Sequence, residues 1–385
     1  MFGVFLSLVT THLCKHADSV PPQLATNCQS TIMSSVTPQH SDGNHPQLRL
    51  VDSAHDDIIW RLAYLPDGRR VVTGSSDGTV KVWNLDNGEE EGTSIEHESQ
   101  ICGLAVTRDG KNIVSVGGDG KIKVWDVKSH ELVEEWTHPE SWPEIAISLD
   151  DRLIAVGAWT VAIYTMEGRQ VNHPIKVGDR MSSLCFSPDG TKVACGTRDG
   201  SRVHDVDGGK LLLGLLQGDW IRDVLWSRDG NRLFSSSDDK TIRCWNSETG
   251  EQIGHPWTGH KDSIRSLSLS PDGSILASAS FDQTVRFWNA TTGNPIKQHL
   301  QHDGQVNAVR FSPSGESVAS AGWDGKVYLW RLNSMNLKDW VIPPFMFWHW
   351  YLPCCRRVQP FLAMNMIPIL SMRVFSRPDR QFDRS

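Results

Sequence analysis

The sequence predicts an all-β fold, a β-propeller of seven four-stranded antiparallel blades. The first observation is the stretch 259–289, which holds three short strand patterns separated by polar turns that leave no room for a helix. The second is repetition: His260 precedes Trp288 by 28 residues, and the same spacing recurs in four other places. The third is the period, because the closing residues of seven copies are 39 to 43 residues apart, at positions 83, 125, 164, 204, 245, 288 and 330. A period of about 40–45 residues is typical of propeller blades.

Residues 1–46 come before the repeats and are expected to form a disordered leader. They are rich in Ser, Thr, Pro, Gln and His and show little periodicity. The apolar run Phe2–Val9 leaves a secretory signal as the alternative. That alternative is disfavoured, because the run lacks a basic segment before it and a small-residue cleavage site close behind it.

A short strand pattern, Leu48–Val51, lies just before the first repeat. After Trp330 the chain offers no good outer strand for the seventh blade. We therefore expect the N-terminal strand to pair with the seventh blade and close the ring, which removes a seam of unpaired backbone. The propeller domain is then residues 47–332.

The seven expected blades are not equally regular. Tyr164 and His204 stand where Trp closes the other copies, and the turn at 158–160 has no Asp. The third and fourth blades are therefore expected to be degraded copies. The blades are expected at about 56–95, 99–136, 140–171, 180–213, 220–255, 263–300 and 305–330.

Residues 333–385 form an irregular apolar and basic tail. Its apolar runs, 340–353 and 361–370, are shorter than the roughly 18–20 residues of a membrane-spanning helix, and prolines interrupt both. A membrane anchor is therefore the disfavoured alternative. The tail could dock on a partner or on the propeller, or it could be a segment under weak structural constraint, which is the favoured interpretation.

The composition of the chain disfavours several classes of function. The net charge of −7 argues against a general nucleic-acid binder. The eight cysteines form no CxxC pair, and four of them lie in strand patterns, where a free Cys acts as a small apolar residue: Cys102, Cys185, Cys195 and Cys244. This usage fits a reducing compartment, the cytoplasm with the nucleus as the alternative. No zinc-ligand spacing and no phosphate-binding loop occur, so neither a metal nor a cofactor is expected.

The repeats resemble those of the WD-repeat β-propeller family. The resemblance rests on Gly259-His260, on Phe186–Gly190, on Ser76–Thr79 and on Val124–Asp126, and it covers about 47–332. It implies a non-catalytic scaffold or adaptor that binds other proteins. The sequence at 247–257 also resembles that of fungal WD-repeat proteins, in which the propeller forms the end of a large nucleotide-binding incompatibility protein. A propeller sensor module of a fungal incompatibility or signalling assembly is therefore the alternative function.

A His, a hydroxyl residue, an Asp and a Trp recur together in four copies. One copy would resemble a hydrolase triad, but four equivalent triads are not expected of one active site. The family resemblance implies a buried hydrogen-bond network instead, in which loss of one member costs roughly 1–3 kcal/mol. Its members are His55, Thr73, Asp77, Trp83, His97, Ser115, Asp119, Trp125, His260, Ser278, Asp282, Trp288, His302, Ser320, Asp324 and Trp330.

The resemblance also places a partner site on the narrower face of the propeller. That face collects the start of each inner strand and the residue before each turn Asp. The residues of interest there are Trp60, Arg180, Arg198, Trp220, Arg222, Arg265, Phe281 and Trp323. Aromatic and Arg side chains are common anchors of binding sites, and only Asp238 among these positions is acidic. An acidic or phosphorylated peptide is the expected ligand, against the alternative that these are ordinary solvated loop residues.

Two other functions stay open. A propeller enzyme needs acid, base or metal groups converging on the central axis, and no such groups are evident in the sequence; clustered carboxylates or histidines at the inner strands would favour an enzyme again. A nucleic-acid or membrane adaptor needs a broader basic patch or an inserting tail, so neither partner is expected.

Overall fold

A computed structural model describes residues 47–51 and 54–332. The expected leader 1–46 and tail 333–385 lie outside the described residues. The chain divides into two units, 1–45 and 46–385, and all described residues belong to the second.

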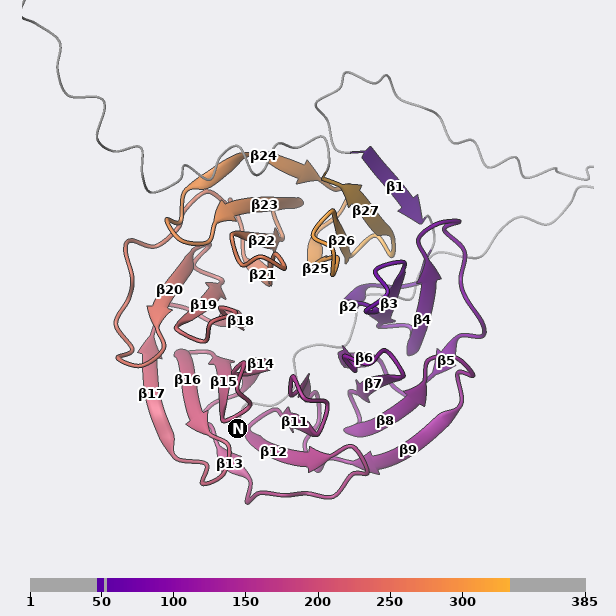
Figure 1. The fold of residues 1–385 in the computed structure, drawn as a ribbon, viewed down its shortest axis with the longest axis horizontal. Helices are drawn as coiled ribbons and strands as arrows, with labels where there is room; N and C mark the ends of the chain where they lie inside the picture. Colours follow the sequence, from indigo (N-terminus) through magenta and orange to yellow (C-terminus); the bar gives the residue numbers. More distant parts are fainter. Residues whose placement is uncertain (1–46, 52–53, 333–385) are drawn as a thin grey trace, which may run out of the picture. The chain divides into compact units, whose positions relative to one another are not determined.

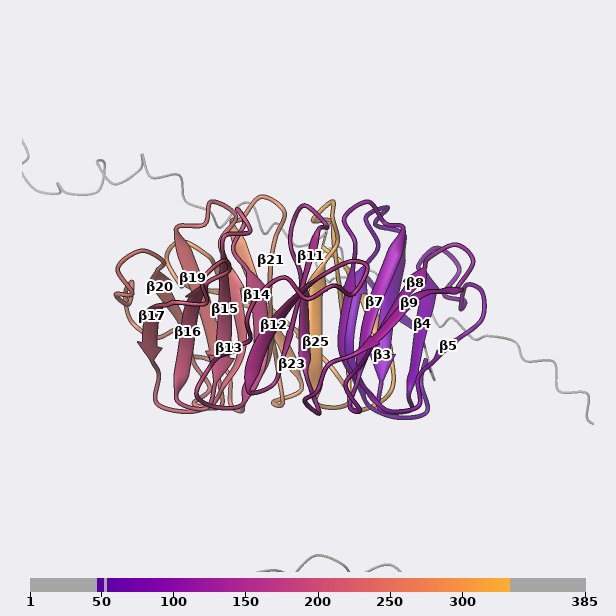
Figure 2. The same ribbon diagram turned by 90° about the horizontal axis from the view of Figure 1, so that it is seen from below.

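The described residues form seven antiparallel sheets arranged in a ring around a central axis (Figure 1), and they include no helix. The predicted seven-bladed propeller is confirmed. In side view the strands run between the two faces of the ring, where turns connect them (Figure 2).

Each blade runs outward from the axis in chain order. Blades one to three comprise β2 (Ile59–Tyr64), β3 (Arg70–Ser75), β4 (Thr79–Asn84), β5 (Ile95–Glu96), β6 (Ile101–Val106), β7 (Asn112–Gly117), β8 (Lys121–Asp126), β9 (Leu132–Thr137), β10 (Glu144–Ile147), β11 (Leu153–Gly157), β12 (Thr160–Thr165) and β13 (Ile175–Lys176). Blades four and five comprise β14 (Met181–Phe186), β15 (Lys192–Thr197), β16 (Gly200–Asp205), β17 (Leu211–Leu216), β18 (Ile221–Trp226), β19 (Arg232–Ser237) and β20 (Ile242–Asn246). Blades six and seven comprise β21 (Ile264–Leu269), β22 (Ile275–Ser280), β23 (Thr284–Asn289), β24 (Pro295–Gln301), β25 (Val306–Phe311), β26 (Ser317–Gly322), β27 (Val327–Arg331) and β1 (Gln47–Val51).

The seventh sheet takes its outer strand from the other end of the domain. Its order is β1-β27-β26-β25, and β1 pairs antiparallel with β27 from Gln47↔Arg331 to Val51↔Val327. The guanidinium of Arg49 also donates to the backbone oxygens of Leu85 and Asp86 in blade one. The N-terminal strand therefore contacts both the last and the first blade.

Blade five differs from the expected four strands. Its sheet has three strands, and its outer position is held only by the isolated bridges Ile242↔Trp257 and Trp245↔Gln252. Between the bridges, Pro256 has no N–H to donate and Gly254 has a φ of 73°. A continuous ladder cannot form through such a segment.

The core lies between neighbouring blades. Phe287 of β23, for example, packs in one cluster with Val309 and Phe311 of β25, and the two Phe rings are 6.1 Å apart. Each blade thus buries its apolar face against the next one, as a repeat that cannot fold alone must.

Six of the seven inner strands carry a register shift near their start, as between Ile59 and Arg61 or between Ile264 and Ser266. A β-bulge inserts one extra residue and redirects the side chains that follow it. In these strands the extra residue is the one that enters the mouth of the ring, for example Trp60 or Arg265. The bulges therefore decide which side chains reach the central axis.

The turn after the second strand of each blade lies at the same end as the start of the inner strand. The backbone N–H of Ser76 donates to Ile58 O at 2.9 Å, and equivalent bonds join Phe281 to Ser263 and Trp323 to Gln305. We call this end the turn face; its turns lie at 76–78, 118–120, 158–159, 198–199, 238–240, 281–283 and 323–325.

Candidate functional site

The repeated His, hydroxyl, Asp and Trp residues form a complete relay in blades one and six. In blade six, Asp282 Oδ2 lies 2.8 Å from His260 Nδ1, and His260 Nε2 lies 2.7 Å from Ser278 Oγ. The indole N–H of Trp288 donates to the same Oγ at 2.8 Å. In blade one the same bonds link Asp77, His55, Thr73 and Trp83.

Blades two and seven hold only the inner half of this relay. His97 bonds Ser115 at 2.6 Å and Trp125 donates to Ser115, but Nδ1 of His97 is buried without a hydrogen-bond partner. Asp119 is exposed. In blade seven, His302 and Trp330 share Ser320, while Asp324 accepts from the hydroxyl of Tyr328 at 2.7 Å.

Two flanking residues explain the difference between the blades. In blade six, Thr284 donates to Asp282 Oδ1 at 2.6 Å and Ser280 accepts the N–H of Asp282, so the other carboxylate oxygen is aimed at His260. Blades two and seven have Gly and Lys at the two equivalent positions. The prediction that Asp119 and Asp324 bond the relay His is therefore wrong.

In blades three and five, other residues take the places of the relay His and of the turn Asp. In blade five, Gln217 takes the His position and accepts from Ser235 at 2.7 Å. In blade three, Glu140 replaces the missing turn Asp: its Oε2 accepts the backbone N–H groups of Ala158, Trp159 and Thr160. Sequence reasoning missed Glu140 because it lies before the inner strand, not in the turn.

Blades five to seven bring five of the eight predicted partner-site residues together with Asp238 on the turn face. The guanidinium of Arg222 lies 4.1 Å from the ring centroid of Trp220 and is also paired with Asp238. The guanidinium of Arg265 lies 4.7 Å from the ring centroid of Phe281. Phe281 in turn meets Trp323 edge to face, with centroids 6.0 Å apart. We call this set the mouth cluster: Trp220, Arg222, Asp238, Arg265, Phe281 and Trp323.

Trp60, Arg180 and Arg198 do not join the mouth cluster. Trp60 belongs to blade one, where its indole N–H donates to Ser76 Oγ at 2.6 Å. The two arginines belong to blade four, and Arg198 is exposed. Within the described part of the chain, no ring contact or ion pair connects these three residues to the cluster.

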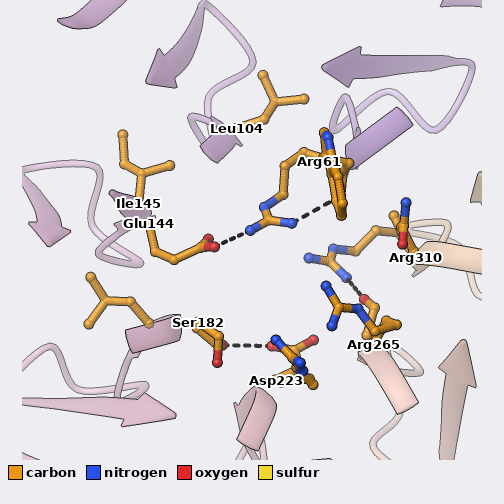
Figure 3. Close-up of a pocket in the computed structure, with 15 residues that line it drawn as sticks. Arg61, Leu104, Glu144, Ile145, Ser182, Asp223, Arg265 and Arg310 are labelled. Atoms are coloured by element: carbon orange, nitrogen blue, oxygen red, sulfur yellow. Dashed lines mark hydrogen bonds and ion pairs between the residues drawn. The ribbon is translucent and has the colours of Figure 1, made fainter. Parts of the chain in front are cut away.

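Below the mouth cluster, the inner strands of all seven blades enclose a cavity of about 80 Å³ (Figure 3). Arg61 of blade one and Glu144 of blade three point toward each other across it and form an ion pair. Gly103 is the equivalent residue of blade two, which lies between them. The pair therefore spans two blade boundaries.

Asp223 and Arg310 make the other links across the cavity wall. Asp223 accepts from the hydroxyl of Ser183 at 2.8 Å and from the backbone N–H of Leu267 at 2.7 Å, which ties blades four, five and six together. Arg310 donates to Ser266 Oγ at 2.9 Å, which ties blade seven to blade six. The wall charges are thus used to hold the blades in register.

The expectation that no acid or base groups converge on the axis is wrong, since Glu144 and Asp223 both line the cavity. Sequence reasoning chose the residues three and five positions after each blade's His. The residues six positions after the His position, here Arg61, Glu144 and Asp223, also reach the axis. Both carboxylates are already bound by groups of the fold, and the described residues contain no cluster of three or more potential metal ligands.

A family model described as "WD domain, G-beta repeat" matches residues 47–84, 88–126, 171–201, 211–246, 250–289 and 293–331. The matches cover more than half of the chain. The chain belongs to the WD-repeat family. The first three strands of its third blade, β10 to β12, fall in the unmatched interval 127–170, where Tyr164 and Glu140 stand in for the usual Trp and Asp.

Curated WD-repeat relatives match part of the chain. Periodic tryptophan protein 2 homolog of Mus musculus is 33% identical over 53% of this chain and 23% of its own length. Telomerase protein component 1 of Mus musculus is 25% identical over 51% of this chain and 8% of its own length. Small ribosomal subunit protein RACK1y of Oryza sativa subsp. japonica is 28% identical over 26% of this chain and 33% of its own length. The chain thus spans only a minor part of these relatives.

The turn face of this WD-repeat propeller carries further aromatic residues at blade three. Trp159 is 54% exposed, and Trp142 is 49% exposed with a φ of 60°. Neither is among the partner-site residues predicted from the sequence, and no sequence pattern predicts a Trp with positive φ such as Trp142. The described residues include no helix long and apolar enough to cross a membrane.

Proposed function

We propose that this WD-repeat propeller is a non-catalytic scaffold that binds a partner protein through the mouth cluster. The observation that carries the proposal is the contact of an exposed Trp with a Phe and an Arg at blades six and seven. Trp323 is 48% exposed and meets Phe281 edge to face, and Arg265 lies over the ring of Phe281. Large rigid aromatic and Arg side chains at the centre of a rim are the usual anchors of protein interfaces.

The charges of the mouth cluster favour an acidic or phosphorylated segment of the partner. The one carboxylate in the cluster, Asp238, is paired with Arg222 and also contacts Ser263. The remaining guanidinium therefore meets the approaching ligand. Arg recognises carboxylate and phosphate groups through paired hydrogen bonds, which a Lys cannot reproduce in the same geometry.

The relatives agree with a role inside larger assemblies, since one is named as a ribosomal subunit protein and another as a component of telomerase. The chain covers a minor part of each, so their partners are not transferred to it. We place the protein in the cytoplasm, with the nucleus as the alternative. The four cysteines in the described part of the chain are free, which suits a reducing compartment.

The test is quantitative affinity capture from extracts of the native cell, with the wild type and two Trp variants. Trp323→Ala removes the cluster's exposed ring, and Trp159→Ala removes an equally exposed ring at blade three of the same face. We expect Trp323→Ala to lose specific partners that Trp159→Ala retains, with equal thermal melts for all three proteins. Undiminished capture by the Trp323 variant would reject the proposed site.

A further inference from the structure

One guanidinium at the mouth of the cavity differs from its neighbours in what it binds. Arg61 is paired with Glu144, Arg222 with Asp238, and Arg310 donates to Ser266 and to backbone oxygens. Arg265 has no hydrogen-bond acceptor among the described residues. Its guanidinium lies over the ring of Phe281. A guanidinium carries five N–H donors, and all five of this one are left for water or a ligand.

The position of Arg265 makes these free donors costly. The residue is the extra one in the bulge between Ile264 and Ser266, so its side chain is turned from the blade into the cavity. Burial, together with the positive charge of Arg222, lowers the pKa of Arg265 to about 10. A half-buried cation beside a second cation is stabilised by an anion that completes its hydrogen bonds.

We infer that Arg265 anchors one carboxylate or phosphate group, carried by an acidic or phosphorylated side chain of the partner, at the mouth of the cavity between Phe281 and Arg222. This inference rests on the proposed function and names the residue that gives it specificity. The cavity of about 80 Å³ admits the end of one side chain, while the peptide backbone stays on the turn face.

The neighbours of Arg265 explain why this residue, and not another Arg of the cluster, takes the anion. Arg222 already uses Nε and Nη2 on the two oxygens of Asp238. Each carboxylate of the cavity wall has an arginine charge beside it, so neither repels the incoming group as an isolated charge would: Glu144 pairs with Arg61, and Asp223 is attracted by Arg310. The ring of Phe281 contacts the guanidinium without supplying an oxygen acceptor for its N–H groups.

The experiment uses degenerate fluorescent peptide pools in which only the central residue is fixed, as Ser, Gln, Glu or phosphoserine. Binding to the full chain is measured by anisotropy. We expect the Glu or the phosphoserine pool to bind about 10-fold tighter than the Gln and Ser pools, the size of a charge-assisted hydrogen bond. A preference for Glu identifies a carboxylate ligand, and a preference for phosphoserine alone identifies a phosphate.

Three variants test whether the preference for an acidic peptide depends on Arg265. Arg265→Met keeps an apolar stem over Phe281 and should remove the preference, while Arg265→Lys should retain only part of it. Arg152→Ala changes the net charge equally at an exposed turn on the opposite face and should leave the preference intact. Removing an unpaired half-buried cation should not lower the melting temperature of Arg265→Met.

The possible failures are distinguishable. If the pools bind and Trp323→Ala weakens them while Arg265→Met leaves the acidic preference unchanged, the Arg265 inference is wrong and the proposed function stands. If neither variant changes binding, both are wrong. A large drop in the melting temperature of Arg265→Met and of Arg265→Lys would assign Arg265 a structural role and also overturn the inference.

Discussion

The wall and the mouth of the central cavity contain the same kinds of residue in opposite situations. On the wall, Arg61 and Glu144 bind each other, and Asp223 binds groups of two neighbouring blades. At the mouth, Arg265 lies over the ring of Phe281 and has no hydrogen-bond acceptor in the described part of the chain, and Trp323 is half exposed. The comparison teaches that a charged residue near a propeller axis is not by itself a binding residue. What distinguishes the two roles is whether the fold already supplies the partner.

The largest expected effect on stability comes from removing the ion pair in the cavity wall. Glu144→Ala would leave Arg61 in the cavity without its carboxylate, which should lower the free energy of unfolding by about 3–5 kcal/mol. Urea denaturation measures the change. The double variant Glu144→Ala with Arg61→Ala should recover part of the loss. A loss below about 1 kcal/mol in the single variant would show that the pair does not hold the ring.

A complete relay and an incomplete relay can be compared within the same propeller. Asp282→Ala should cost about 1.5–3 kcal/mol, because it removes a charged partner of His260 in a complete relay. Asp119→Ala should cost less than about 0.5 kcal/mol, because Asp119 is exposed and does not reach His97. Equal losses in urea denaturation would contradict the assignment of an incomplete relay to blade two.

A smaller effect concerns pH. Burial lowers the pKa of His97 to about 4, aided by the positive charge of Lys123. Below pH 6.5 the unfolded chain therefore takes up a proton that the folded chain does not, and stability falls as the pH drops toward 4.

His97→Gln, which copies the natural Gln217 of blade five, should remove this contribution. Between pH 7 and pH 5 the variant should lose on the order of 1–2 kcal/mol less than the wild type, as measured by urea midpoints at both pH values. An identical acid loss in both proteins would mean that His97 is protonated in the fold.

The smallest effect is expected from the exposed indoles. Trp323→Ala and Trp159→Ala should each change the free energy of unfolding by less than about 0.5 kcal/mol, since both rings are half exposed. Differential scanning calorimetry against the wild type measures this. A clear destabilisation by Trp323→Ala alone would make that ring part of the packing and remove it from the partner site.

The fold could be predicted from the sequence because each blade repeats the same strand and turn signals, so that errors in one copy are corrected by the others. The third and fourth blades have Tyr164 and His204 in place of Trp, so the period locates them, with the motif Phe186–Gly190 as further support in the fourth blade. The outer strand of blade five was not predicted correctly, because Pro256 and Gly254 interrupt the ladder without changing the period.

The candidate site was less predictable. The mouth positions follow from the repeat register, but the bulges in β2 and β18 displace the register by one residue, so Arg61 and Asp223 were missed. Glu144 was missed as well, although its strand β10 has no register shift. Whether an Arg is satisfied also depends on residues distant in the chain: Arg61 and Glu144 are 83 positions apart. No local pattern contains that information.

One paired substitution tests the difference between wall and mouth most directly. Arg61→Met and Arg265→Met remove the same group from the same cavity, and each variant is measured for urea unfolding and for binding to the acidic and neutral peptide pools. We predict that Arg61→Met loses about 3 kcal/mol or more of stability, while Arg265→Met keeps its stability and loses the preference for the acidic pool. Equal destabilisation by both variants, or an acidic preference that survives in Arg265→Met, would contradict the account.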